Sequence, residues 1–256
     1  MTAPILDVQQ VSLSFRGIKA LTDLSFAVPQ GEICALIGPN GAGKSSLLNI
    51  INGVYRASSG RIVFDGAPFD RPTPMAAAQR GIGRTFQNNA LFHRMSVLDN
   101  VLTGLTRLGR CSLPEIAFRI GRHPAERRQF RRRADEIIGF LEIAPYRDTV
   151  VGGLPYGLQK RVEMARALVA SPKLLLLDEP MAGMNADEKV ELSRLIAEVN
   201  RSFGTTVVLI EHDIGVVMGL SHHVVVLDYG RKVGDGTPAE VRANPEVIAA
   251  YLGTRH

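Results

Sequence analysis

The sequence predicts an α/β fold with a mostly parallel sheet flanked by helices, an N-terminal antiparallel β subdomain and an inserted α-helical subdomain. Residues 5–28 alternate in places between apolar and polar residues, which is typical of antiparallel strands with one buried face. Residues 33–37 and 174–177 are continuous apolar runs, and the run 205–210 ends in four apolar residues after two threonines, as in buried strands of a parallel sheet. Between the first two runs, residues 88–170 contain apolar residues at helical spacing.

We therefore expect a single domain over residues 1–256. Its core comprises residues 1–87 and 171–237, residues 88–170 form the helical subdomain, and residues 238–256 form C-terminal helices. The chain has 256 residues, of which 45% are apolar, so it can fill one large domain with an inserted lobe. Tryptophan is absent and aromatic residues make up only 6%, which predicts a mostly aliphatic core.

The charge and the cysteines narrow the class of protein. A net charge of +5 favours anionic partners such as nucleotides, nucleic acid or lipid headgroups, without choosing among them. Cys34 and Cys111 show no disulfide or metal-binding pattern, so we expect a reducing cytoplasm. No apolar run approaches the roughly 20 residues of a membrane span, and the first residues do not resemble a secretory signal. Work at a membrane would therefore need another chain to span it.

The most specific motif is the segment 38–45, GPNGAGKS, which fits the phosphate-binding P-loop pattern G-x-x-x-x-G-K-[ST]. Its glycines let the main chain approach an anion closely. Lys44 is expected near the β- and γ-phosphates, and the Ser45 hydroxyl is a ligand for Mg²⁺. A buried strand precedes the motif and a helix follows from Ser46, as the motif requires. The alternative is a Gly-rich turn with an exposed lysine. The predicted binding residues are Gly38, Pro39, Asn40, Gly41, Ala42, Gly43, Lys44, Ser45 and Ser46.

Two other runs, 174–177 and 205–210, are followed by polar residues that indicate a catalytic or metal-binding role. Asp178 and Glu179 follow four leucines, and ligands bind at the carboxyl ends of strands in open parallel sheets. Asp178 is thus placed to hold Mg²⁺ and Glu179 to polarise an attacking water, unless the pair merely caps a loop. His212 follows the run 205–210 at the same edge, where we predict a catalytic or γ-phosphate-sensing role over a structural one.

Other residues are ambiguous by themselves. Phe15 precedes a turn at Arg16–Gly17, where it could stack on a nucleotide base, although from the residues alone a core role is preferred. Gln87 ends a stretch that returns to the core, and a lone glutamine is usually a surface side chain.

The segment 121–139 is strongly basic and allows two interpretations. It is either a patch for nucleic acid or anionic lipid, or a solvated helix face backed by Ile137, Ile138, Phe140 and Leu141. The solvated face is preferred because Phe130 is the only aromatic residue among the arginines, whereas stacking on nucleic acid would need several. The arginines are Arg122, Arg127, Arg128, Arg131, Arg132 and Arg133.

Taken in their order along the chain, these motifs resemble those of the ATP-binding subunit of ATP-binding-cassette (ABC) transporters, and the resemblance covers essentially the whole chain. The segment 154–161, LPYGLQKR, stands where that family carries a signature of the form L-S-G-G-Q. This segment, residues 182–185 (AGMN) and the tail 244–253 (NPEVIAAYLG) resemble the branched-chain amino-acid importer subfamily. The resemblance implies an ATPase that powers such an importer, with ATP and Mg²⁺ as cofactors.

The resemblance also implies roles and partners. Two subunits form a head-to-tail dimer in which each ATP lies between one P-loop and the partner's signature. Phe15 matches the base-stacking aromatic, which reverses the preference for a core role. Gln87 matches a glutamine that contacts Mg²⁺ and relays to the membrane subunits, Glu179 the general base, and His212 the γ-phosphate switch. The implied partners are two transmembrane permease subunits and, indirectly, an extracytoplasmic solute-binding protein, without nucleic acid. The implied location is peripheral, at the cytoplasmic face of the inner (plasma) membrane.

The signature departs from the family pattern. Pro155 stands at the usual serine and lacks a hydroxyl and an N–H group, and Leu158 replaces a glutamine. Proline is tolerated in a first helical turn, so the donors left to contact the partner's ATP are the N–H groups of Tyr156, Gly157 and Leu158. Asn185 replaces a frequent aspartate. These departures favour a heterodimer with two unequal ATP sites over a homodimer.

Two other classes compete with this interpretation. A soluble cassette ATPase acting on nucleic acid or ribosomes would usually carry two cassettes or an inserted coiled coil, and the sequence shows neither a second P-loop nor a heptad run. A simple P-loop kinase or GTPase would leave Gln87 and the segment 154–161 without a role.

Overall fold

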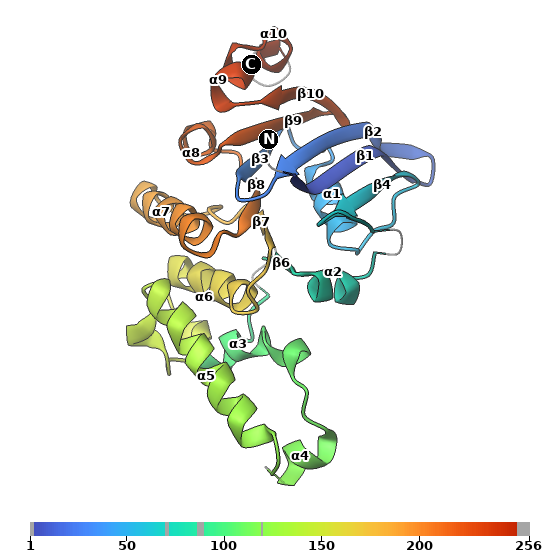
Figure 1. Ribbon diagram of the computed structural model, residues 1–256. Helices are drawn as coiled ribbons and strands as arrows, with labels where there is room; N and C mark the ends of the chain where they lie inside the picture. Colours follow the sequence, from blue (N-terminus) through green and yellow to red (C-terminus); the bar gives the residue numbers. More distant parts are fainter. Residues whose placement is uncertain (1–2, 70–71, 86–89, 119, 250–256) are drawn as a thin grey trace. The chain divides into compact units, whose positions relative to one another are not determined.

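A computed structural model of the chain describes residues 3–69, 72–85, 90–118 and 120–249. Contacts divide the chain into two compact units, which are considered separately (Figure 1). The core unit comprises residues 1–84 and 173–256, and the helical unit comprises residues 85–172.

The core unit begins with an antiparallel sheet, as the alternating pattern predicts. Its strand order is β2-β1-β4-β5. A turn at Arg16–Gly17 joins the first two strands, and both turn residues have positive φ, 47° and 89°. Apolar side chains of this sheet point into the main hydrophobic cluster. The strands are β1 (Pro4–Phe15), β2 (Ile18–Pro29), β4 (Ser59–Phe64) and β5 (Ala67–Pro68).

A second sheet of six strands carries the predicted site, in the order β10-β9-β3-β8-β7-β6. All its neighbouring strands are parallel except the pair β9–β10. Every residue of β3, β7 and β8 is buried, which explains why their sequences are apolar except for Thr206 at the start of β8 and Asp178 at the end of β7. The strands are β3 (Ile33–Ile37), β6 (Ile82–Arg84), β7 (Leu174–Asp178), β8 (Thr206–Ile210), β9 (His223–Asp228) and β10 (Arg231–Gly236).

Helices cover this sheet on both faces. Helix α1 shares the main cluster with both sheets, and Cys34 and Leu36 of β3 face that cluster. Ala35 and Ile37 point the other way, into a second cluster with α8, α9 and α10. Helix α1 begins at Lys44, two residues earlier than expected, because Gly43 at φ 98° turns the chain into the helix there. The helices are α1 (Lys44–Ile51), α2 (Pro74–Arg80), α7 (Ala186–Phe203), α8 (Ile214–Leu220), α9 (Pro238–Ala243) and α10 (Pro245–Val247).

The helical unit packs its longer helices around its own apolar core. Gly104, at the end of α3, lies so close to α6 that a Cβ atom there would be 2.1 Å from the Arg166 carbonyl oxygen. Along the described parts of the chain, no helix is long and apolar enough to cross a membrane. The elements are α3 (Val97–Thr103), η1 (Thr106–Leu108), α4 (Leu113–Phe118), α5 (His123–Phe140), η2 (Ala144–Tyr146), η3 (Val151–Gly153) and α6 (Tyr156–Leu168).

Asn100 is the polar centre of the helical unit. Its side chain is fully buried in α3 and binds the turn that precedes the helix. The Oδ1 atom accepts the Phe92 N–H at 2.9 Å, and Nδ2 donates to the carbonyls of Phe92 and Ser96 at 3.1 and 3.0 Å. The two carbonyls also accept backbone N–H groups, from Met95 and Asn100 itself, so the Phe92 N–H is the group whose hydrogen bond depends on this side chain.

Asn100→Ala should lower the free energy of unfolding by about 2–3 kcal/mol, because the Phe92 N–H loses its acceptor and a small cavity opens at a fully buried position. Urea unfolding followed by circular dichroism measures the change. Gln129→Ala, at an exposed position of α5, is the control and should change stability by less than about 0.5 kcal/mol. Equal losses in the two variants would contradict the assigned role of Asn100.

Candidate nucleotide-binding and catalytic site

The P-loop follows β3, and its shape depends on close backbone approaches. Gly38 has φ 148°, and a Cβ atom there would lie 2.0 Å from the Leu227 carbonyl oxygen of β9. Gly43 has φ 98°, and a Cβ atom would lie 2.7 Å from the Ala20 carbonyl oxygen. The loop therefore needs glycine at both positions for space as well as for backbone conformation.

Lys44 closes this loop from the inside. Its side chain is buried, and Nζ donates to the carbonyl oxygens of Gly38 and Pro39 at 2.6 and 2.9 Å. Burial lowers the pKa of the Lys44 amine, while nearby Glu179 and Asp178 act in the opposite direction. Phosphate oxygens approaching the loop would meet a positive charge already held in place. Ser45, the next residue, is exposed.

Asp178 ends β7 as a buried carboxylate with two different oxygens. Oδ2 accepts a hydrogen bond from Arg84 Nη2 at 3.0 Å, whereas Oδ1 is buried and has no hydrogen-bond partner among the described residues. Burial raises the pKa of this carboxyl, although Arg84 opposes the shift. A carboxylate oxygen and the Ser45 hydroxyl are the hard oxygen ligands that Mg²⁺ prefers, so this donor set fits the predicted ion.

Arg84 is a site residue that the sequence analysis did not single out. It ends β6, and its guanidinium binds Asp178 of β7 and Asn49 of α1, the latter through Nη1 at 2.7 Å. It therefore fixes the predicted Mg²⁺ ligand against the helix that follows the P-loop. Its signal in the sequence was a charged residue at the end of a short apolar stretch, three residues before Gln87.

Glu179 and His212 lie after neighbouring strands, β7 and β8, and contact one another. His212 Nε2 lies 2.8 Å from Glu179 Oε1. Since an ionised carboxylate can only accept, the imidazole donates this hydrogen bond through a protonated Nε2. Glu179 has φ 49°, an uncommon conformation for a residue other than glycine, and its N–H donates to the Ile210 carbonyl at 3.0 Å. The backbone thus turns the carboxylate toward His212.

Glu211 is a second residue that the sequence analysis missed. Its carboxylate is buried and accepts the N–H groups of Met181 at 2.9 Å and His212 at 3.2 Å. Burial raises its pKa, against the effect of these two hydrogen bonds. It joins the loop after β7 to the loop after β8 and so positions both Glu179 and His212. Its signal was its place as the first of three polar residues after a buried strand.

Phe15, Asn185 and Gln87 are three further residues that the sequence analysis singled out. Phe15 is 43% exposed, so it is not a core side chain, and its ring meets Tyr55 edge-on with centroids 5.2 Å apart. Asn185 caps α7 by accepting the Glu188 N–H at 2.9 Å, so its amide already has a local function. Gln87 lies outside the described residues.

In the helical unit, the signature segment forms the start of α6. Pro155 is the N-cap residue, with φ −52° and ψ 149°. The sequence analysis expected it one position later, within the first helical turn. The extended ψ explains the difference, because helical angles begin only at Tyr156. Among the described residues no side chain caps this end, so the N–H groups of Tyr156, Gly157 and Leu158 begin the helix without a side-chain acceptor there. Such an end favours anions.

Comparisons with known proteins agree with this geometry. The profile of the ABC transporter family matches residues 21–182, and the profile of the branched-chain amino acid ATP-binding cassette transporter matches residues 231–256. BraF of Pseudomonas aeruginosa, a high-affinity branched-chain amino acid transport ATP-binding protein, is 37% identical over 99% of both chains. LivG of Escherichia coli, described in the same words, is 36% identical over 99% of both chains.

Solved structures show the same fold. The ADP conformation of an ATP-binding cassette of an ABC transporter matches with a TM-score of 0.85 and 31% identity, over 98% of this chain and 100% of that chain. A nucleotide-free cassette from an ABC transporter also gives 0.85, with 30% identity over 97% of this chain and 99% of that chain. This protein therefore belongs to the ABC transporter family as one of its ATP-binding subunits, which hydrolyse ATP to drive transport.

Proposed function

We propose that this chain powers an importer of branched-chain amino acids or related small solutes. One observation of the structure supports it most: Lys44, Asp178, Glu179 and His212 follow strands β3, β7 and β8 at the same edge of one sheet. Similarity to BraF and LivG over nearly the full length supports the solute class. The same relatives are transport proteins, which favours an importer over an ATPase that acts on nucleic acid.

The nucleotide would be held by the P-loop. We assign its phosphates to the backbone N–H groups of residues 38 and 40–46 and to the Lys44 ammonium, since Pro39 has no N–H group. We assign its base to a stack on Phe15, which Tyr55 supports from the side. Ser45 and Asp178 would hold Mg²⁺, with Gln87 as a further ligand. The bound ion would neutralise phosphate charge.

Glu179 would accept a proton from the attacking water. The hydrogen bond from His212 orients its carboxylate, and Glu211 holds the backbone on both sides of the pair. We assign His212 to the γ-phosphate as well, because its exposed ring at the strand end can donate the same N–H to a phosphate oxygen. The orientation of Glu179 would then depend on whether the phosphate is present.

The complete site would need a second subunit. The open end of α6 would face the partner's ATP through the N–H groups of residues 156–158, and Pro155 would make this contact weaker than a serine would. We therefore propose a heterodimer with a second ATP-binding subunit, on two permease subunits at the cytoplasmic face of the membrane. A solute-binding protein would act on the opposite side.

Glu179→Gln should reduce ATP hydrolysis by about 10²–10⁴-fold, because the amide cannot accept the proton of the attacking water. ATP should remain bound. Phosphate release and equilibrium binding of labelled ATP measure the two effects separately. The control is Glu136→Gln at an exposed position of α5, which should hydrolyse ATP normally. Unchanged turnover in Glu179→Gln would exclude it as the general base.

Lys44→Ala should weaken ATP binding by about 10- to 100-fold, because a charge-assisted hydrogen bond to phosphate is lost. Titration with a fluorescent ATP analogue gives the dissociation constant. Arg201→Ala, which removes an exposed positive charge from α7, provides the comparison and should bind like the unaltered chain. An unchanged affinity in Lys44→Ala would argue against the P-loop assignment.

Pro155→Ser tests the weak signature. In the Glu179→Gln background, the added hydroxyl and N–H should increase the fraction of ATP-dependent dimer, which sedimentation velocity measures. Pro155→Ala restores the N–H alone and separates the two contributions. If neither variant forms more dimer than Glu179→Gln alone, proline does not limit this contact.

A further inference from the structure

The net positive charge of the chain comes from one short segment of the helical unit. Residues 106–133, here called the basic tip, contain nine arginines and two glutamates, a net charge of +7. The rest of the chain has 21 basic and 23 acidic residues, a net charge of −2. The basic tip comprises η1, α4 and the first part of α5, and nothing in the nucleotide site uses it.

Both glutamates of the basic tip are used to fold it. Glu115 accepts the N–H of Ser112 at 2.8 Å and forms an ion pair with Arg122 at 2.9 Å. Glu126 accepts the Arg110 N–H at 2.8 Å. Hydrogen bonds from Arg122 and Ser112 lower the pKa of Glu115, so it stays ionised in this role. The two acids join the loop, α4 and α5, and neither forms an ion pair with the arginines farther along α5.

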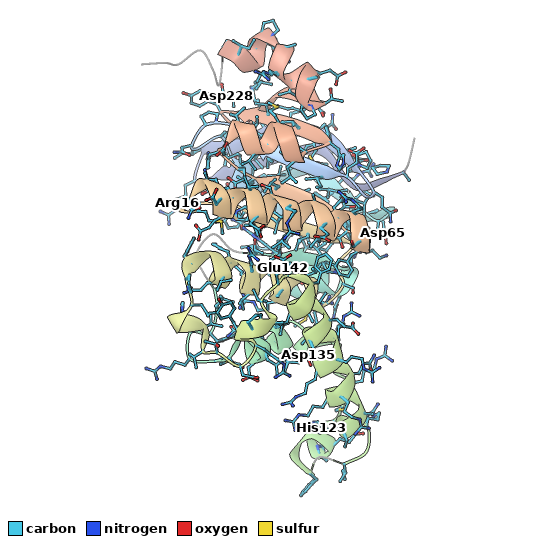
Figure 2. All side chains as sticks on the ribbon, turned by 90° about the vertical axis from the view of Figure 1, so that its left-hand side faces the viewer. Arg16, Asp65, His123, Asp135, Glu142 and Asp228 are labelled. Carbon is cyan, nitrogen blue, oxygen red and sulfur yellow. The ribbon has the colours of Figure 1, made fainter. Side chains whose placement is uncertain are left out.

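Four arginines of α5 consequently remain uncompensated. Arg127, Arg128, Arg131 and Arg132 are exposed, and they form no hydrogen bond or ion pair with the described part of the chain. Their spacing places them on one side of the helix, within an arc of about 140° around its axis. Side chains carrying nitrogen stand out from α5 between the labelled Asp135 and His123 (Figure 2). The preferred sequence interpretation, a solvated face with apolar residues behind it, matches the burial of Ile137 and Ile138.

A solvated face does not explain two exposed apolar side chains that lie in the basic tip just before α5. Phe118, the last residue of α4, is 74% exposed, and Ile120, between α4 and α5, is 59% exposed. The Ile120 carbonyl accepts the His123 N–H at 3.3 Å, which fixes this turn to the start of α5. Exposed apolar side chains and unpaired arginines in one short segment are the composition of an interfacial membrane contact. Nucleic acid would instead need a series of stacking aromatics, and Phe130 is the one aromatic residue between Arg127 and Arg132.

We propose that the basic tip binds the surface of an anionic lipid bilayer. The four arginines contact headgroup phosphates, while Phe118 and Ile120 enter the boundary between headgroups and acyl chains. This contact is separate from ATP hydrolysis and from the permease subunits. It can therefore be tested with vesicles alone, and its failure would leave the proposed ATPase function untouched.

The first test is co-flotation of the purified chain with vesicles. Binding is expected to vesicles of phosphatidylcholine with one quarter phosphatidylglycerol, to decrease with salt, and to be absent with phosphatidylcholine alone. The variant R127Q/R128Q/R131Q/R132Q should lose about tenfold or more in affinity while keeping its basal ATPase activity and its circular dichroism spectrum. The matched control R56Q/R201Q/R231Q/R242Q removes the same charge from exposed arginines of the core unit and should still bind.

The second test uses the absence of tryptophan from the chain, since a single introduced indole is a unique fluorophore. With anionic vesicles, Phe118→Trp should shift its emission to shorter wavelength and be quenched by brominated acyl chains. Phe203→Trp, at an exposed position of the core unit, should do neither.

Equal vesicle binding by the two four-arginine variants would overturn the proposal, as would an unchanged emission of Phe118→Trp. Binding of a labelled oligonucleotide through the same arginines, with no binding to anionic vesicles, would also overturn it and assign the surface to nucleic acid.

Discussion

Ionised groups buried at one edge of a hydrophobic sheet are the constraint on which the rest of the site depends. An unpaired charge in such a place is costly, so each one is held by fixed partners. Loop carbonyls surround the Lys44 ammonium, Arg84 pairs with Asp178, and two backbone N–H groups bind Glu211. The partners needed to bury these charges also set their positions. The charged groups are therefore already in fixed positions before a nucleotide binds, because burying them requires these partners.

The same constraint explains which parts of the site could be predicted. The P-loop is contiguous in the sequence, and Asp178 and Glu179 follow a buried run of leucines, so local patterns identify them. Arg84 and Glu211 are different, because their roles arise from pairing between distant segments. Strand β6 has only three residues, too few for any periodicity, and it becomes a strand through its parallel pairing with β7.

The sequence also could not predict which side chains are buried against neighbouring elements. The alternation along β1 is compatible with either an inward or an outward Phe15, and the choice follows from its place at the end of the hairpin beside Tyr55. In the helical unit, apolar spacing predicted α5 and the residues behind it, but not that Glu115 of α4 and Glu126 of α5 would be used within the basic tip. Hydrogen bonds between side chain and backbone leave no periodic pattern, whereas apolar faces do.

The order of strands in the larger sheet has a consequence for synthesis of the chain. Strand β3, which leads into the P-loop, lies between β8 and β9, and the Gly230 N–H binds the loop carbonyl of Ala42 at 3.1 Å. Every neighbour of β3 in its sheet therefore leaves the ribosome more than 160 residues after it. The helical unit, whose contacts are local, has been made by then. A nascent chain thus acquires its nucleotide pocket only when nearly complete, so ATP cannot assist the folding of its first two hundred residues.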